Sequence, residues 1–186
     1  MSRAVLLDPA IGSLIVGCFA VLFASAASHK LRHLEKFSQI FADYGLPPAF
    51  NRWRVAWLVP LLEIAIAAGL LPPVSRAAAA ALGAGLLLSY AFAIALNLRA
   101  GRDAIACGCG GLDDRRPIAA WMVWRNLLLA IVLALAMLPW NARALEWTDG
   151  VTLGFGLAAL TLLYFCAERL LGELGRAPAA GNRGTP

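Results

Sequence analysis

The chain has 186 residues, of which 61% are hydrophobic and only 15% are charged. Soluble domains carry roughly 25% charged residues, so this composition favours a membrane protein. The formal net charge is +5, but the polar stretches are too short to bury a core of their own. We therefore relate the positive charge to loop orientation and to the lipid bilayer, and expect no nucleic-acid partner.

Five apolar segments are long enough to predict helices that cross a bilayer, which takes about 20 residues. The first is also compatible with a signal peptide, because Ala24-Ser25-Ala26 resembles a cleavage site. Its basic region is only Arg3, offset by Asp8, so we favour a retained first helix. Pro60 is expected to kink the second helix. The five segments are residues 9–28, 55–71, 77–98, 118–139 and 151–167.

Residues 29–44 have apolar side chains at helical spacing and polar side chains on the other face, which predicts an interfacial amphipathic helix. Small residues at 83–85, and glycines at 150 and 154, predict close helix packing. The predicted fold class is all-α, a polytopic membrane helical bundle with four to five transmembrane helices plus the interfacial helix. We expect residues 1–171 to form a single domain and residues 172–186 a flexible tail.

Two opposite charges lie inside the predicted spans. Glu63 and Arg125 enter from the same side at similar depth, so we predict that they pair inside the bundle. The alternative is a protonated Glu63 and an Arg125 that extends to the interface. Trp121 and Trp124 lie near that side of the fourth span, either as an interfacial aromatic belt or as an aromatic wall beside the cysteines.

The polar segment between the third and fourth spans carries Cys107 and Cys109, separated only by Gly108. A disulfide between them would close a small, strained ring, and strained disulfides are readily reduced. The pair is thus either a redox centre or two thiols in a flexible turn. We expect Cys166 to be buried and inert rather than a third partner, and Cys18 to pack in the core. No zinc-type spacing is present, so we predict no metal site.

Several short motifs in order resemble the MauE family, of the wider DoxX-like group of membrane proteins. The resemblance covers about residues 10–170, and its most specific part is the cysteine segment followed by Arg-Asn. One departure is Gly110-Gly111, because family members often have an aromatic residue before the second glycine. The motifs are Ser28-His29-Lys30-Leu31, Tyr44-Gly45-Leu46-Pro47, Pro60-Leu61-Leu62-Glu63, Asn97-Leu98-Arg99-Ala100-Gly101-Arg102, Cys107-Gly108-Cys109-Gly110-Gly111 and Trp124-Arg125-Asn126.

The resemblance implies a role in the maturation of methylamine dehydrogenase, whose small subunit is rich in disulfides and carries tryptophan tryptophylquinone. The implied partners are a MauD-like thioredoxin-fold protein and the small-subunit precursor. By analogy with DsbB and vitamin K epoxide reductase, Cys107 and Cys109 would be the redox pair of a thiol–disulfide oxidoreductase. A quinone would accept the electrons, with Glu63, Arg125, Trp121 and Trp124 supporting the site.

Two other functions remain open. One is a non-catalytic membrane scaffold that docks the partner or the precursor. The other is inward electron transport, which needs a second thiol pair; Cys18 and Cys166 are poor candidates because they lie on different helices at different depths.

Membrane sidedness is the point on which the sequence arguments conflict. The side that carries the cysteine segment also carries most lysines and arginines, which favours the cytoplasm by the positive-inside rule. A disulfide centre belongs on an oxidising face, and the family role implies the periplasmic face of the bacterial inner membrane. We favour the periplasmic face. The side in question carries Lys30, Arg32, Lys36, Arg52, Arg54, Arg99, Arg102, Arg115, Arg116, Arg169, Arg176 and Arg183, against Arg3, Arg76 and Arg143 opposite.

Overall fold

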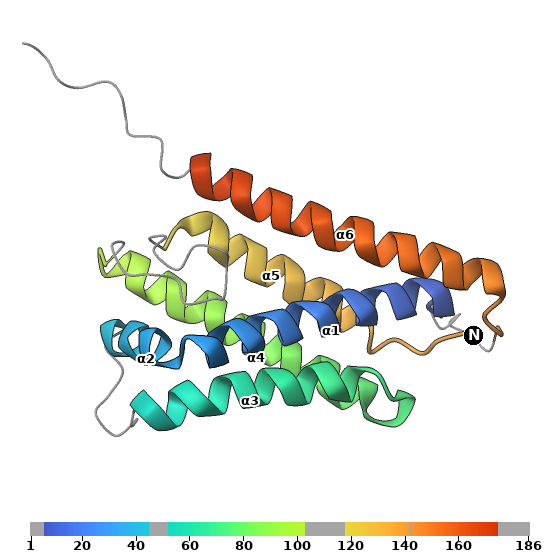
Figure 1. The fold of residues 1–186 in the computed structure, drawn as a ribbon, viewed down its shortest axis with the longest axis horizontal. Coiled ribbons are helices and arrows are strands. Elements are labelled where there is room, and N and C mark those ends of the chain that lie inside the picture. The colour runs from blue at the N-terminus through green and yellow to red at the C-terminus, as the bar shows by residue number, and fades with distance from the viewer. Residues whose placement is uncertain (1–5, 45–51, 103–117, 142, 175–186) are drawn as a thin grey trace, which may run out of the picture.

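The computed structural model describes residues 6–44, 52–102, 118–141 and 143–174 (Figure 1). Within these residues the chain is helical and contains no strand, which confirms the predicted all-α class. Four of the helices are long and apolar enough to cross a membrane, namely α1, α3, α4 and α6. The helices are α1 (Pro9–Arg32), α2 (Leu34–Asp43), α3 (Arg52–Leu70), α4 (Pro73–Arg99), α5 (Ala120–Leu135) and α6 (Trp147–Leu174).

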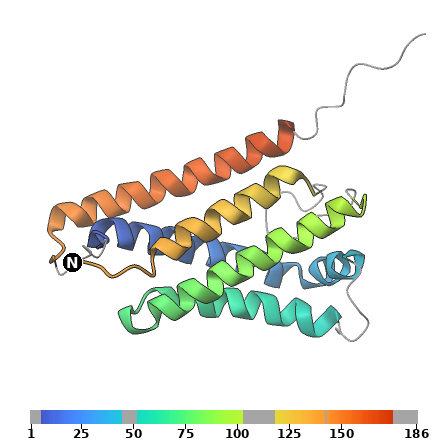
Figure 2. The same ribbon diagram turned by 180° about the vertical axis from the view of Figure 1, so that it is seen from behind.

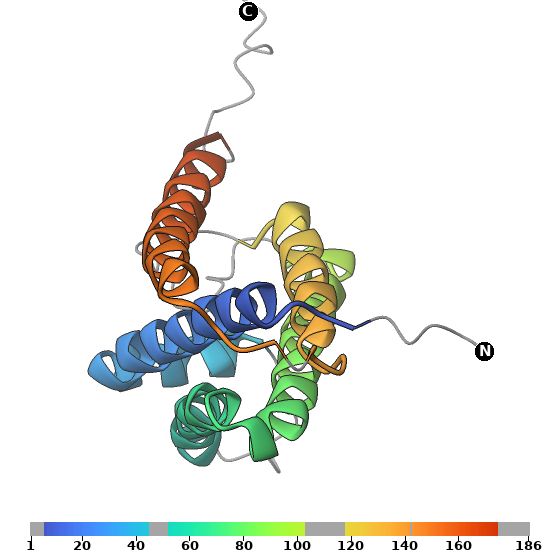
Figure 3. The same ribbon diagram turned by 90° about the vertical axis from the view of Figure 1, so that its right-hand side faces the viewer.

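The long helices run alternately up and down the molecule, as Figures 1 and 2 show. Helices α1, α3, α4 and α5 form a four-helix arrangement in which α3 packs on α1 and α4, and α5 packs on α4 and α1. Helix α6 lies outside it, with its backbone against α1 and separated from α5 (Figure 3). Short α2 lies at the end of the bundle where α1 ends and α3 begins.

The main core is apolar and is made by the four packed helices. Phe19 and Phe23 of α1 meet Ile66 of α3, Leu87 of α4 and Leu133 of α5, and all five side chains are buried. The buried positions of α1 recur every three or four residues along one face, as expected for a helix with one face against its neighbours. This core therefore depends on α1.

Gly83 lets α4 approach its neighbours closely, as predicted. A Cβ atom placed there would lie 2.8 Å from Leu133 Cδ2 and 3.1 Å from both Ile66 Cγ2 and Phe23 Cε2. Gly85, Gly150 and Gly154 have no such neighbour within 4 Å. The prediction of close packing is therefore correct at Gly83 and wrong at these three glycines for the part of the chain that the structure describes.

We expect Gly83→Ala to destabilise the bundle by about 1–3 kcal/mol, because the added methyl group overpacks the core. Gly85→Ala is the matched control on the same helix, since its Cβ would meet nothing within 4 Å. The check is the unfolding free energy of each variant in lipid nanodiscs. Equal stabilities for the two alanine variants would show that α4 can shift to accommodate the methyl group.

Several predicted segments need corrected boundaries; the fifth span, predicted at 151–167, lies within the longer helix α6. The fourth span was predicted at 118–139, but helix α5 covers only Ala120–Leu135, about 24 Å at 1.5 Å per residue. It ends in turns before Pro139, because the position before a proline disfavours helix. The amphipathic helix was predicted at 29–44, but residues up to Arg32 complete α1, and α2 begins at Leu34. Lys30 consequently belongs to the first long helix.

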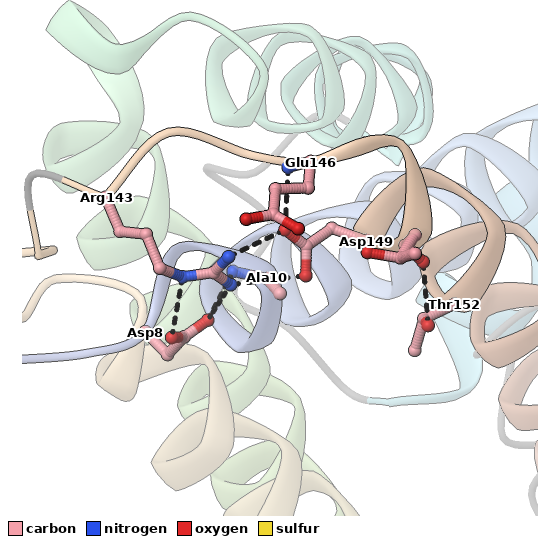
Figure 4. Close-up of polar contacts among 7 residues, drawn as sticks. Asp8, Ala10, Arg143, Glu146, Asp149 and Thr152 are labelled. Atoms are coloured by element: carbon pink, nitrogen blue, oxygen red, sulfur yellow. Dashed lines mark hydrogen bonds and ion pairs between the residues drawn. The ribbon is translucent and has the colours of Figure 1, made fainter.

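A polar cluster links the beginnings of α1 and α6 at the end of the bundle opposite α2 (Figures 1 and 4). Asp8 caps α1 by accepting a hydrogen bond from the Ala10 N–H at 2.9 Å. The Arg143 guanidinium bonds to Asp8 at 3.2 Å and to Asp149 at 2.8 Å. The Arg143 hydrogen bonds, together with the Ala10 N–H, hold the pKa of Asp8 below its usual value. One arginine thus bridges two acidic groups that stand at the positive ends of two helix dipoles.

The lowered pKa of Asp8 makes this link dependent on pH. A carboxyl whose folded pKa is depressed stabilises the fold above its unfolded pKa, 3.8 here, and loses that contribution as pH falls through the folded pKa. We expect Asp8→Asn, which keeps a capping side chain, to lower the melting temperature slightly at neutral pH. The difference from the unaltered protein should shrink as pH falls below 3.8 and vanish in melting curves recorded below the lowered folded pKa. A difference that persists there would contradict the role assigned to the charge.

Candidate functional site

Cys107 and Cys109 lie outside the described residues, but the chain on both sides of their segment is described. Helix α4 ends at Arg99, and the turn that follows is closed by a hydrogen bond of 3.0 Å from the Arg102 N–H to the Asn97 carbonyl. Gly101 has a φ of 67°, the left-handed conformation that glycine commonly supplies after a helix. The segment therefore leaves α4 from a well-defined helix end.

The chain re-enters the bundle at a second, smaller apolar cluster. Ile118 and Met122 are buried against Ile94 of α4, and Tyr44 at the end of α2 packs on the same cluster. Residues 102 and 118 therefore lie at the same end of the bundle as α2, the end at which α4 finishes and α5 begins (Figure 1). The segment that carries the two cysteines begins and ends there.

Below this end, three helices are joined by a buried polar cluster. Lys30 of α1 forms an ion pair with Glu63 of α3, and the two side chains are 2% and 1% exposed. The Tyr90 hydroxyl of α4 donates to Glu63 Oε1 at 2.8 Å and accepts from Lys30 Nζ at 3.2 Å. The ammonium group also lies 5.4 Å from the Phe37 ring centre, a favourable cation–π distance. A charge this deep would be costly without such partners.

The predicted Glu63–Arg125 pair is wrong, because each group has another partner. Glu63 pairs with Lys30, and Arg125 pairs with Glu168 of α6. Lys30 was expected on the polar face of an interfacial helix, but α1 continues through it and turns its side chain inward. Glu168 was expected beyond the fifth span, but α6 extends past it to Leu174.

Arg125 and Glu168 form a second polar cluster, which joins α5 to α6. The Tyr164 hydroxyl donates to Glu168 Oε1 at 3.0 Å, and the Arg125 guanidinium lies 5.5 Å from the Trp121 ring centre. Trp124 is 72% exposed on the outer surface. The two tryptophans thus have different environments: Trp121 packs on Arg125 as a cation–π partner, and Trp124 faces outward as expected of an aromatic belt.

The other two cysteines, Cys18 and Cys166, differ in their exposure. Cys166 is exposed on α6, so the prediction of a buried cysteine is wrong there; Cys18 of α1 is half-buried. Among the described residues there is no group of three or more side chains suited to hold a metal ion.

A cavity of about 310 Å³ lies between α1, α5 and α6. Its lining is almost wholly aliphatic and aromatic, with Thr161, Tyr164 and Cys18 as the polar members. Tyr164 connects it to the Arg125–Glu168 cluster. The remaining lining residues are Phe19, Val21, Leu22, Leu129, Val132, Leu160, Leu163, Phe165 and Ala167.

Comparison with known proteins places the chain in a family. Residues 8–139 match the family model described as methylamine utilisation protein MauE. Methylamine utilization protein MauE of Paracoccus denitrificans is 36% identical over 88% of both chains. The proteins of that name from Methylorubrum extorquens and Paracoccus versutus are 36% and 37% identical, over 94% and 97% of both chains. No solved structure matches the chain. The family model and the relatives match most of this chain, which therefore belongs to the MauE family.

Proposed function

We propose that this protein acts in the membrane during maturation of methylamine dehydrogenase, and that it promotes disulfide formation in the small subunit through Cys107 and Cys109. The relatives are named for methylamine utilisation, which supports the pathway. The observation that carries the redox proposal is the Cys107-Gly108-Cys109 sequence, in a segment whose two flanks are fixed at one end of a membrane bundle. Two thiols one residue apart exchange readily with a third.

The chemistry is thiol–disulfide exchange with a MauD-like thioredoxin-fold partner. A thiolate of the partner attacks one sulfur of the Cys107–Cys109 disulfide and forms a mixed disulfide, while the other cysteine leaves as a thiolate. The partner's second thiol then attacks the mixed disulfide, which releases the partner oxidised. Both cysteines of this protein end as thiols, so two electrons have moved from the partner to the membrane protein.

The two polar clusters act in this proposal as positioning groups. The Lys30–Glu63–Tyr90 cluster joins α1, α3 and α4, and α4 is the helix from which the cysteine segment leaves. The Arg125–Glu168 pair joins α5, where the segment ends, to α6. Each ties a helix that borders the cysteine segment to its neighbours, and neither is proposed to touch the reacting sulfurs.

We place the protein in the bacterial inner membrane with the cysteine segment in the periplasm, where disulfides persist. The excess of arginine and lysine on that side opposes this orientation under the positive-inside rule. A membrane-impermeant maleimide applied to intact, reduced cells separates the two orientations. Labelling of Cys107 and Cys109 before lysis is expected; labelling only after lysis would place the segment in the cytoplasm.

The exchange reaction is tested directly with purified protein in nanodiscs. The oxidised protein is mixed with one equivalent of a reduced thioredoxin-fold dithiol, and free thiols on both proteins are counted by alkylation and mass spectrometry. We expect one disulfide to be transferred per molecule. The Cys107→Ser/Cys109→Ser double variant should transfer none, whereas Cys18→Ser/Cys166→Ser should behave like the unaltered protein.

The alternative is a scaffold that docks the partner without redox chemistry. Helix α2 favours it, because the exposed Glu35, Lys36 and Gln39 lie on one helix beside the cysteine end. Under this alternative the double serine variant would still support maturation, and charge reversal at Glu35 and Lys36 would abolish it.

A further inference from the structure

The cavity between α1, α5 and α6 is open to the bilayer at its side. Val21 and Leu163 line it and are 37% and 65% exposed. Helices α5 and α6 make no backbone contact with each other among the described residues, and the cavity lies between them (Figure 3). A molecule dissolved in the hydrocarbon of the bilayer therefore has lateral access to it.

The lining of the cavity favours hydrocarbon over water or a polar ligand. Its polar members are only Thr161, Tyr164 and Cys18, and the Tyr164 hydroxyl already donates to Glu168 at 3.0 Å. A buried water typically makes about three hydrogen bonds, and a lining with so few polar groups favours an apolar occupant instead. The chemistry of the lining thus points to an aliphatic chain.

The size of the cavity distinguishes a single acyl chain from a protein helix. A helix with its side chains is about 10–12 Å in diameter and rises 1.5 Å per residue, so each residue takes up roughly 120–170 Å³. The cavity volume of about 310 Å³ corresponds to about two residues of a helix, whereas a transmembrane helix has about 20. An acyl chain is narrow enough to enter from the side and to extend along the cavity.

A cation without an acidic partner lies one helical turn beyond the cavity. Arg169 follows the lining residue Phe165 by four positions on α6, and residues at this spacing are neighbours on a helix surface. Arg169 is exposed and takes part in no ion pair within the described part of the chain; the adjacent Glu168 pairs with Arg125. It lies near the end of the apolar segment Trp147–Leu171, the level at which a bilayer presents its phosphate groups.

We propose that the cavity holds one acyl chain of an anionic phospholipid whose phosphate binds Arg169. The apolar lining selects the chain, and the guanidinium binds phosphate through charge-assisted hydrogen bonds. A zwitterionic headgroup brings its own cation, so the unbalanced arginine favours a lipid with net negative charge. The lipid fills the space that the protein leaves open between α5 and α6. This site does not depend on the disulfide exchange proposed above.

The headgroup is tested by native mass spectrometry of the full-length protein. The protein is released from detergent micelles that contain equal amounts of phosphatidylglycerol and phosphatidylcholine with the same acyl chains. We expect one lipid to be retained, with phosphatidylglycerol favoured about fivefold, the factor expected from one arginine near an anionic headgroup. Arg169→Gln should abolish this preference while a lipid is still retained. An unchanged preference in Arg169→Gln, or none in the unaltered protein, would overturn the proposal.

The matched control for the headgroup is Arg54→Gln. Arg54 is also exposed and lies in the first turn of α3, at the same end of the bundle as Arg169 (Figure 1), but α3 does not line the cavity. The variant should keep the preference for phosphatidylglycerol. A loss as large as in Arg169→Gln would mean that the total charge at this end selects the lipid, and it would contradict a site at Arg169.

The acyl chain is tested by filling the cavity. Thr161→Trp should abolish the retention of either lipid, and if this variant does not fold, Leu129→Trp on α5 fills the same cavity. Leu162→Trp is the matched control, because Leu162 is 66% exposed and does not line the cavity. Retention that persists with the cavity filled, or that is lost equally in Leu162→Trp, would mean that lipids bind only around the outside of the bundle and would overturn the proposal.

Discussion

Replacing Cys107 or Cys109 by serine is expected to reduce methylamine dehydrogenase activity to that of cells that lack this protein. Serine cannot form a disulfide, so neither single variant can pass oxidising equivalents to a thiol partner. The loss should be complete rather than partial, because the two cysteines act as one unit. The measurement is enzyme activity in cells grown on a second carbon source in the presence of methylamine, together with the number of disulfides in the small subunit by mass spectrometry.

The control for this result is the remaining pair of cysteines. Cys18→Ser and Cys166→Ser remove a half-buried and an exposed thiol and are expected to leave activity within about twofold of normal, since surface and partly buried substitutions usually have small effects. Membrane levels of all four variants must match. Normal maturation in the Cys107 and Cys109 variants would favour the scaffold function instead.

The second large effect is expected from breaking the Lys30–Glu63 pair on one side only. Lys30→Met leaves the Glu63 carboxylate buried without its cation, which costs about 3–5 kcal/mol of folding free energy. Adding Glu63→Gln removes the charge while keeping an oxygen for the Tyr90 hydroxyl, so the double variant should recover most of the loss. Unfolding free energies measured in bicelles check both values.

The design separates charge from volume, because methionine and glutamine are close in size to the residues they replace. Recovery in the double variant would identify the unpaired charge as the cause. If Lys30→Met is as stable as the unaltered protein, the pair does not hold α1, α3 and α4 together. If the double variant is as unstable as Lys30→Met, the remaining contacts of Lys30, among them the cation–π contact with Phe37, are the main contribution.

The positions of the long helices were predictable from hydrophobicity alone, because each apolar segment is longer than the apolar segments of a soluble protein. The all-α class and the segment order agree with the structure. The end of the first helix was harder to predict. The charges after residue 28 indicated an interfacial helix, yet the buried stripe of α1 continues through Ala27 to Lys30 at the same three- and four-residue spacing. That spacing was the available signal for a buried lysine.

The ion-pair partners could not be predicted from the depth of each charged residue in the membrane. The sequence predicted similar depths for Glu63 and Arg125, but depth does not say which helices are neighbours, and α3 packs on α1 and α4 rather than on α5. Glu168 was missed for a related reason, since a charge at the end of an apolar segment normally marks the interface. Here α6 continues beyond Glu168, and the Glu168 carboxylate pairs with Arg125.

The redox role of Cys107 and Cys109 is tested most directly by trapping the mixed disulfide. The oxidised protein in nanodiscs is mixed with a thioredoxin-fold partner whose second cysteine has been replaced by serine, and the products are analysed by non-reducing gel and mass spectrometry. We predict a one-to-one covalent adduct linked through Cys107 or Cys109. An adduct through Cys18 or Cys166, or no adduct at all, would contradict the proposed exchange.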